Sequence, residues 1–357
     1  MKTVLMETRK PFLLAIEKRT WTAILLLSLF TLGPLPGLER IRAADKPLGL
    51  EDYLKRLNYE PVALSRTKEN KLLATGHLGS RKCAFLVDTG WGMTSLNERN
   101  ARGLQTLGQL GGVLDDGVWG RLTNSSIVIM EKLVFGRAQF LNQPADVNKL
   151  HMDFVPVEFS GVLGPDFFIR NFCLLDCAEE RLYVRGVKPS DEESKVLAES
   201  LRRSGFVEVP FQFEPSLHLI VRAQAQGQPA RLLIDTGSPF SLLDESQLQR
   251  LGLKAVKQVV TGSLIAEDVS ARLSGVNEIG SHKLRVTILD TFQIGPRTAK
   301  NVHFGVVDLK AWENQKPGSP QMDMQGIFGV EMLTSYGALI DFPSGKLWFR
   351  PRTKAPN

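Results

Sequence analysis

The sequence predicts an all-β protein built from two similar lobes. Three observations predict this fold: the two halves of the chain align with each other, both halves consist of short apolar runs separated by turn residues, and the tripeptide Asp-Thr-Gly ends one such run in each half. Internal repetition of this length indicates a duplicated domain. Short strand-like runs with turn signals between them are typical of β-sandwiches and β-barrels.

The repeat becomes visible when residue 59 is placed on residue 206. The first block then aligns without gaps, and a second block, also free of gaps, repeats later in each half. The register changes between the blocks, so the second half carries extra residues in its middle. The aligned segments are Phe85–Gly90 with Leu232–Gly237, Thr94–Leu96 with Ser241–Leu243, and Gly161–Phe168 with Gly326–Leu333.

Two helices are predicted outside the β-rich halves. Leu50, Tyr53, Leu54 and Leu57 have the spacing of an amphipathic helix. A capping-box pattern starting at Ser190 predicts a linker helix over 190–204, which Gly205 ends. The predicted segments are 1–44 (signal peptide or membrane anchor), 45–58 (N-terminal lead-in), 59–187 (N-terminal lobe), 188–205 (linker helix), 206–350 (C-terminal lobe) and 351–357 (tail).

The leader has basic residues up to Arg19, an apolar core over 21–32 and helix breakers over 33–37. A core of this length is typical of a secretory signal rather than of a spanning helix. The cleavage site is poor, because Arg42 stands where a small residue is preferred, so an uncleaved membrane anchor is the alternative. Met6 is an alternative start. In either case we expect an exported protein, periplasmic or secreted.

The formal net charge of +6 is concentrated at the N-terminus. Residues 1–44 hold seven basic and three acidic side chains, so the leader carries +4 and the remainder +2. No basic stripe is left that would favour nucleic acid as a partner. No Cys/His spacing resembles a zinc site, so we expect no metal and no cofactor. All five histidines (His77, His151, His218, His282 and His303) are predicted to be core or surface residues.

The three cysteines do not form a disulfide framework. Cys173 and Cys177 are four residues apart, a distance of about 13 Å in a strand, which is too far for a bridge. They can pair only if a turn intervenes, and either can pair with Cys83. At least one thiol is left over.

The two Asp-Thr-Gly segments predict a pair of carboxylates, Asp88 and Asp235, brought face to face by the two lobes. Two carboxylates a few ångströms apart cannot both ionise, so they share one proton. The ionised partner can activate a water molecule as general base, and the protonated partner can supply the proton to a leaving amine. These are the requirements of peptide hydrolysis, with a titration that belongs to the pair.

The neighbouring residues suit this role. Gly90 and Gly237 allow a sharp turn and expose backbone N–H groups to the carboxylates. Thr89 and Thr236 can form hydrogen bonds across to the other lobe and so join the two loops.

These residues resemble the pepsin/retropepsin clan of aspartic proteases, most closely the bacterial retropepsin-like type with two lobes in one chain. The resemblance covers about residues 59–350 and includes the elements Val162–Gly164 and Ile327–Gly329. It implies two retropepsin-like β-barrel lobes with a cleft between them. It also implies that each apolar element packs behind the catalytic loop of its own lobe, that a short helix follows, and that an extended peptide binds in the cleft.

One residue departs from the clan's pattern. A Ser, Thr or Ala usually follows the Gly; Ser238 fits and Trp91 does not. A hydroxyl there can donate to the carboxylate and lower its pKa, so we predict that activity extends toward neutral pH; an optimum below about pH 3 would contradict this. Trp91 either contacts substrate near the cleft, or faces outward or fills a gap in its own lobe.

The clan also implies hairpin flaps over the substrate. The candidate in the first half is Gly111–Asn124, with Trp119 as a substrate contact, and the candidate in the second half is Thr261–Leu273. Hairpin tips that contain glycine can act as lids. Both segments can equally be ordinary surface hairpins.

The sequence therefore predicts a monomeric aspartic endopeptidase, a hydrolase whose partner is a peptide or protein substrate. Its catalytic residues are Asp88 and Asp235, supported by Thr89, Gly90, Thr236, Gly237 and Ser238. The alternative is a catalytically silent peptide-binding protein with the same lobes, which Trp91 favours. A third hypothesis, in which lobes pair between chains, is disfavoured by the matched duplication.

Overall fold

The chain divides into two units, Met1–Lys46 and Pro47–Asn357. The computed structural model describes residues 49–114, 122–148, 159–255, 285–309 and 323–351, all in the second unit. The predicted leader lies outside the described residues. Within the described ranges no helix is long and apolar enough to cross a bilayer.

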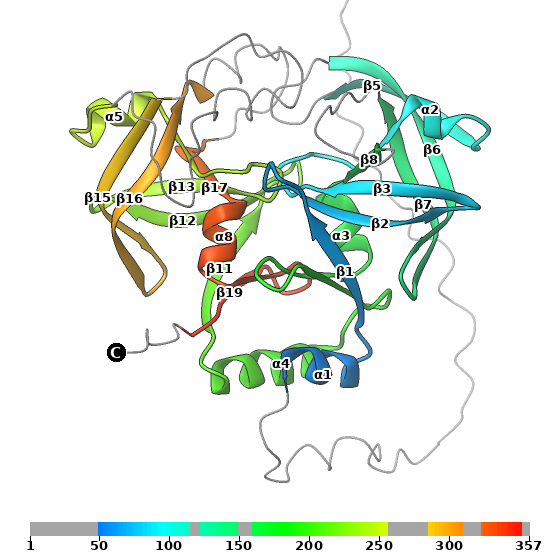
Figure 1. Cartoon of the computed structure of the whole chain (residues 1–357), viewed down its shortest axis with the longest axis horizontal. Coiled ribbons are helices and arrows are strands. Elements are labelled where there is room, and N and C mark those ends of the chain that lie inside the picture. The colour runs from blue at the N-terminus through cyan, green and yellow to red at the C-terminus, as the bar shows by residue number, and fades with distance from the viewer. Residues whose placement is uncertain (1–48, 115–121, 149–158, 256–284, 310–322, 352–357) are drawn as a thin grey trace, which may run out of the picture. The chain divides into compact units, whose positions relative to one another are not determined.

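The N-terminal half forms a closed ring of six strands (Figure 1). Strand β1 (Glu60–Arg66) leads into the ring, and β5 (Thr106–Leu114) pairs with β6 outside it. In the order of their pairing, the ring strands are β2 (Leu72–Leu78), β3 (Arg81–Val87), β8 (Phe159–Leu163), β4 (Ser95–Asn97), β7 (Ala138–Asn148) and β6 (Leu122–Phe135).

The C-terminal half repeats the same ring with the same order of pairing. Its lead-in strand is β11 (Val207–Phe213). The ring strands are β12 (Leu219–Ala225), β13 (Gln228–Asp235), β17 (Gly326–Gly329), β14 (Leu242–Asp244), β16 (Arg297–Val307) and β15 (Arg285–Ile294). The predicted all-β fold of two homologous barrels is therefore confirmed.

A third sheet of six strands joins the halves, and the sequence did not predict it. Its centre is the antiparallel pair of β9 (Leu174–Asp176) and β18 (Ala338–Asp341), one strand from each half. The strands β10 (Arg181–Val184) and β19 (Lys346–Phe349) flank this pair, and β1 and β11 form the edges. The lobes thus share backbone hydrogen bonds as well as side-chain contacts.

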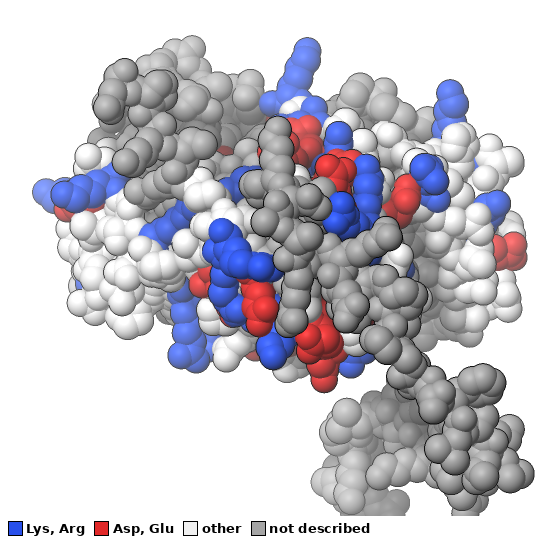
Figure 2. Space-filling view, turned by 90° about the horizontal axis from the view of Figure 1, so that it is seen from below, with Lys and Arg blue, Asp and Glu red and all other residues white. Residues whose placement is uncertain are grey.

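Two helices cover one face of this joining sheet, as the labels in Figure 1 show. They are α1 (Leu50–Arg56) and α4 (Asp191–Arg203), both close to their predicted positions. The predicted capping box is present, because Ser190 and Glu193 each bond the other's backbone N–H. Apolar side chains of both helices pack on the sheet residues Leu174, Leu339 and Trp348. On the face seen from below, basic and acidic side chains are interleaved (Figure 2).

The remaining described helices are short: α2 (Glu98–Ala101), α3 (Pro165–Arg170), α5 (Ser246–Arg250) and α8 (Val330–Ser335). Helices α3 and α8 each follow the apolar-apolar-Gly element of their own lobe, as the resemblance implied. Cys83, Cys173 and Cys177 are all buried free thiols. The disulfide alternatives are therefore not realised.

Candidate active site

Each Asp-Thr-Gly loop is held by the two strands behind it. Strand β3 runs parallel to β8, with Val87 opposite Leu163, and the Asp88 N–H donates to the Leu163 carbonyl at 3.1 Å. Strand β13 runs parallel to β17, with Asp235 opposite Gly329. The apolar-apolar-Gly elements therefore pack behind the loops as expected. Buried parallel strands give the aspartates a rigid base.

Within each loop, one carboxylate oxygen accepts two backbone N–H groups. Asp88 Oδ1 accepts from Gly90 at 2.8 Å and from Trp91 at 3.1 Å. Asp235 Oδ1 accepts from Gly237 at 2.8 Å and from Ser238 at 3.0 Å. Such bonds fix the orientation of each carboxylate and favour its ionised form.

The two loops are joined by a reciprocal set of four hydrogen bonds. The Thr89 N–H donates to Thr236 Oγ1 at 3.1 Å, and the Thr236 N–H donates to Thr89 Oγ1 at 3.0 Å. The Thr89 hydroxyl donates to the carbonyl of Ile234 at 2.7 Å, and the Thr236 hydroxyl to that of Val87 at 2.8 Å. Both threonines are fully buried. The predicted threonine bonds across the lobes are present.

The glycines bring the carboxyl groups together. A methyl group added at Gly90 would overlap the carboxyl group of Asp235, and one added at Gly237 would overlap that of Asp88. Each loop therefore approaches the other's aspartate more closely than any residue with a Cβ allows. Asp88 and Asp235 are buried, with exposed fractions of 8% and 7%.

Burial raises the pKa of Asp88 well above its ordinary value. The carboxyl group of Asp235 raises it further, and the positive charge of Lys71 opposes the shift. Desolvation and like charge both disfavour ionisation of the two carboxyl groups at the same time.

The structure changes the reason given for the difference between the loops. The Ser238 hydroxyl donates to the carbonyl of Phe240 at 2.7 Å rather than to a carboxylate. The raised pKa of Asp88 comes first from burial and then from Asp235. The prediction of activity toward neutral pH remains a prediction, now with a different cause.

Trp91 lies inside its own lobe. Its side chain is 4% exposed, and its indole N–H donates to Ser95 Oγ at 2.7 Å. The ring packs with Leu73, Leu86 and other residues of a buried cluster. This position agrees with the gap-filling alternative for Trp91, while contact with a substrate stays a prediction.

Two acidic residues that the sequence analysis missed support the loops from behind. Asp166 of α3 accepts from the Thr94 N–H at 2.7 Å and from its hydroxyl at 2.6 Å. At the equivalent place in α8, Glu331 accepts from the Ser241 N–H at 2.6 Å. Burial raises the pKa of Glu331 to about 7. The repeat already aligned Asp166 with Glu331, a signal that could have found them.

Two basic residues beside the loops were also missed. Lys71 and His218 occupy equivalent positions in the repeat, and each bonds the carbonyl of the opposite loop's glycine, Lys71 to Gly237 and His218 to Gly90. The prediction for His218 named it only as a core or surface histidine. It is buried, but beside the candidate site.

The predicted flaps lie largely outside the described residues. Trp119 and the whole of Thr261–Leu273 fall there, and of Gly111–Asn124 only the ends of β5 and β6 are described. In the described part of the chain, no group of three or more His, Cys, Asp or Glu residues is placed to hold a metal ion.

The profile of the family described as "Aspartyl protease" matches residues 221–332 of this chain. Among solved structures, a retropepsin-like aspartic protease from Rickettsia conorii matches with 18% identity and a TM-score of 0.27, over 41% of this chain and 92% of that chain. Basic 7S globulin from soybean matches with 11% identity and a TM-score of 0.42, over 83% and 95%. The search of curated proteins gave no match. The family match, together with the two barrels and their paired loops, confirms that the chain resembles the aspartic proteases of the pepsin/retropepsin clan.

Proposed function

We propose that this protein is an aspartic endopeptidase in which Asp88 and Asp235 activate a water molecule for attack on a peptide bond. One observation carries the proposal: two buried carboxyl groups on equivalent loops meet across the lobes, where a reciprocal set of threonine bonds joins those loops. A purely structural Asp-Thr-Gly turn has no need of a second carboxyl group against it. Burying two carboxyl groups side by side is costly and is typical of a functional site.

The proposed reaction uses one proton shared by the pair. The ionised carboxyl group takes a proton from the attacking water, while the protonated one donates to the carbonyl oxygen of the substrate. The first carboxyl group then gives the proton that it took from water to the leaving amine as the C–N bond breaks. The other takes a proton from a hydroxyl of the tetrahedral intermediate, so the pair again holds one proton. The backbone N–H groups of Gly90 and Gly237 hold the two carboxylates in place during these transfers.

The test is the cleavage of an unfolded protein and of a peptide library by the purified chain, with Asp88→Asn and Asp235→Asn as variants. We expect pepstatin-sensitive cleavage in the wild type and a loss of about 10⁴-fold or more in either variant, because the pair acts as a unit. Circular dichroism and thermal unfolding verify that both variants fold. If cleavage survives either substitution, the proposed pair is wrong.

The alternative is a peptide-binding protein without catalysis. Trp91 was the feature that favoured it, and the side chain of Trp91 packs within its own lobe. Such a protein would bind unfolded protein equally well with and without the two substitutions, and would cleave nothing. Isothermal titration with a library peptide separates this outcome from enzymatic activity.

We propose further that the protein acts as a monomer outside the cytoplasm on an extended peptide. Both aspartates come from one chain, which supports the monomer, and the leader sequence supports export. Solution mass by light scattering tests the first point. N-terminal sequencing of the protein recovered from the exporting cell tests the second and shows whether the leader is cleaved.

A further inference from the structure

Two equivalent turns precede the barrels. One lies between β1 and β2 and ends at Lys71; the other lies between β11 and β12 and ends at His218. In both, the first residue of the turn donates its N–H to the carbonyl of the last, at 2.9 Å for Thr67 to Lys71 and at 2.9 Å for Glu214 to His218. The residue before the basic one has a positive φ in both turns. The backbone therefore gives the lysine and the histidine the same position in their lobes.

Each basic side chain crosses to the opposite lobe. Lys71 Nζ donates to the carbonyl of Gly237, and His218 Nε2 lies 2.9 Å from the carbonyl oxygen of Gly90. Both side chains are buried, at 5% and 3% exposure for the residues as a whole. The two glycines are those that pack against the aspartates. The carboxyl pair is thus flanked by one lysine and one histidine.

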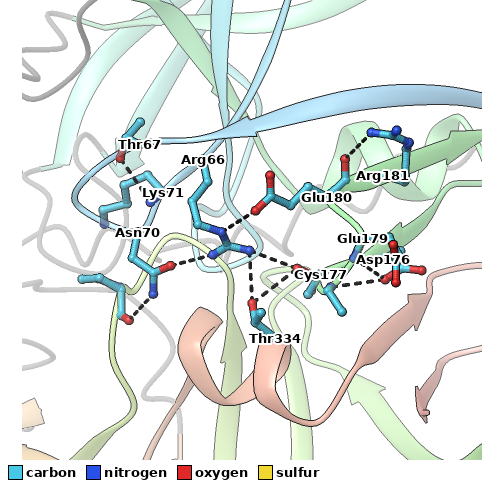
Figure 3. Close-up of polar contacts among 12 residues, drawn as sticks. Arg66, Thr67, Asn70, Lys71, Asp176, Cys177, Glu179, Glu180, Arg181 and Thr334 are labelled. Atoms are coloured by element: carbon cyan, nitrogen blue, oxygen red, sulfur yellow. Dashed lines mark hydrogen bonds and ion pairs between the residues drawn. The ribbon is translucent and has the colours of Figure 1, made fainter. Parts of the chain in front are cut away.

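The first turn is anchored so that Lys71 has little freedom. Arg66 bonds Glu180 at 2.7 Å and reaches the carbonyl of Cys177 at 3.0 Å and the Thr334 hydroxyl at 3.2 Å (Figure 3). Asn70 donates to the carbonyl of Pro239 at 3.0 Å. Thr334 and Pro239 belong to the C-terminal lobe, so the turn is fixed to both lobes. The anchored turn therefore fixes the backbone position from which the Lys71 side chain crosses to the C-terminal lobe.

Lys71 lies among acidic side chains, and their charges and its burial act on its pKa in opposite directions. Burial lowers the pKa of Lys71, and the negative charges of Asp88, Asp235 and Glu69 oppose this shift and favour the ammonium form. Gly237, the glycine to which Lys71 is bonded, lies directly against Asp88. Burial and the charge of Asp235 raise the pKa of Asp88, and the charge of Lys71 lowers it. Three ionisable groups buried together are least costly when their net charge is zero. When Lys71 carries its positive charge, that condition is met by one proton shared between the two carboxyl groups.

We propose that Lys71 is a positioning residue that, through its positive charge, sets how many protons the Asp88–Asp235 pair holds. The inference rests on the proposed function, since it concerns the same pair. The zero-charge state is the singly protonated pair that the proposed reaction needs. The lysine stabilises this state against double protonation, and burial with like charge stabilises it against double ionisation.

The proposal predicts a shift of the pH profile in one direction. Removing the positive charge raises the pH at which the pair loses its first proton and the pH at which it loses its second. Both limbs of the plot of kcat/KM against pH therefore move to higher pH, by about 1 pH unit or more. A residue that only joins the lobes would lower activity or stability at every pH and leave the limbs in place.

The experiment compares four variants of the full chain with the wild type on one peptide from the library. Lys71→Gln keeps a hydrogen-bond donor for Gly237 without the charge, and Lys71→Met removes both. We expect both variants to shift both limbs and Lys71→Arg, which keeps the charge, to restore the wild-type profile. Lys82→Met removes a charge from an exposed lysine of the same lobe and should leave the limbs unchanged.

A second measurement does not depend on activity. The carboxyl carbons of Asp88 and Asp235 are followed by NMR over pH in protein labelled with ¹³C-aspartate, with assignments from the two Asp→Asn variants. If the wild type cleaves nothing, the proposed function fails, while the titration still tests Lys71. If the aspartates titrate alike in the wild type and in Lys71→Gln, Lys71 does not set the protons of the pair and the inference is overturned. If Lys71→Met does not fold, Lys71→Gln alone decides.

Discussion

The two lobes share one backbone plan and differ in the side chains placed on it. Both have a ring of six strands in the same order, an Asp-Thr-Gly loop, and a short helix behind that loop. At the equivalent positions beside the loops they differ: Lys71 against His218, Trp91 against Ser238, and Asp166 against Glu331. The comparison shows that the geometry of the pair is symmetric while its charge environment and its packing are not.

The packing difference is a compensated exchange. In the N-terminal lobe Trp91 bonds Ser95, a large residue beside a small one. In the C-terminal lobe the equivalent residues are Ser238 and Leu242, a small residue beside a large one. Leu242 lies in the buried cluster that corresponds to the Trp91 cluster, and Leu309 and Met324 complete it. The two lobes fill the same space behind the loop by different means.

The largest expected effect tests the symmetric part of the comparison. Alanine at Gly90 or at Gly237 would place a methyl group inside the opposing carboxyl group. We expect a loss of cleavage of about 10²-fold or more from either substitution, because a displacement of about 1 Å at a catalytic group has that effect. Gly108→Ala is the control, since a Cβ at Gly108 meets nothing within 4 Å.

Unequal losses from the two glycines would mean that the loops do not contribute equally. Cleavage assays on the three variants, with thermal unfolding to verify the fold, decide the point.

The next effect tests the compensated exchange. Trp91→Ser leaves a cavity and the Ser95 hydroxyl without its indole partner, so we expect a loss of about 3 to 5 kcal/mol in the free energy of unfolding. Adding Ser95→Leu gives the N-terminal lobe the C-terminal pair and should recover part of that loss. Urea unfolding of the single and double variants measures both. A double variant no more stable than Trp91→Ser would contradict the exchange.

The acidic residues behind the loops give a stability effect that depends on pH. The folded pKa of Glu331 is about 7, against an ordinary value of 4.5. A carboxyl group whose pKa is raised in the folded protein stabilises the fold fully at pH values below its pKa in the unfolded chain. This contribution is lost as the pH rises through the folded pKa of about 7. We therefore expect the free energy of unfolding of Glu331→Gln, taken relative to that of the wild type, to be about 3 kcal/mol higher at pH 8 than at pH 4.

Urea unfolding from pH 4 to pH 8 measures that difference, and pH 4, where the wild-type carboxyl group is protonated, is the internal control. A constant difference between variant and wild type over this range would show that Glu331 does not titrate there.

The smallest expected effect concerns the bonds between the loops. Thr89→Val and Thr236→Val each remove one hydroxyl that both donates and accepts across the lobes. We expect each to lower the free energy of unfolding by about 1 to 3 kcal/mol, because buried backbone groups lose their partners. The double variant should cost less than the sum, since the bonds form one network. Strict additivity would indicate that the four bonds act independently.

Much of the fold follows from local signals that the sequence carries twice. The apolar runs, the glycines of the loops and the capping box at Ser190 depend on near neighbours, so they could be predicted. The joining sheet could not, because the pairing of Leu175 with Ile340 leaves no pattern in either strand alone. Short buried strands have continuous apolar sequence whatever their partners are.

The candidate site divides in the same way. The aspartates and threonines were predicted from the motif. Lys71 and His218 were missed because a lysine at a turn is ordinarily a solvated residue, and only the three-dimensional approach to the opposite glycine gives it a role. The alignment of the halves did place the two basic residues opposite each other, and the exchange of Trp91 and Ser95 for Ser238 and Leu242 was present in the same alignment.

The joining sheet has a consequence for the order in which the molecule is made. Strand β1 pairs with β10, β11 pairs with β19, and the central strand β9 finds its partner only in β18. Pairings between residues this far apart in the sequence are slow to form, since a long segment must first close on itself. During synthesis both aspartates, Asp88 and Asp235, are therefore made before β18, and the lobes are not joined through the centre of this sheet until that strand is made.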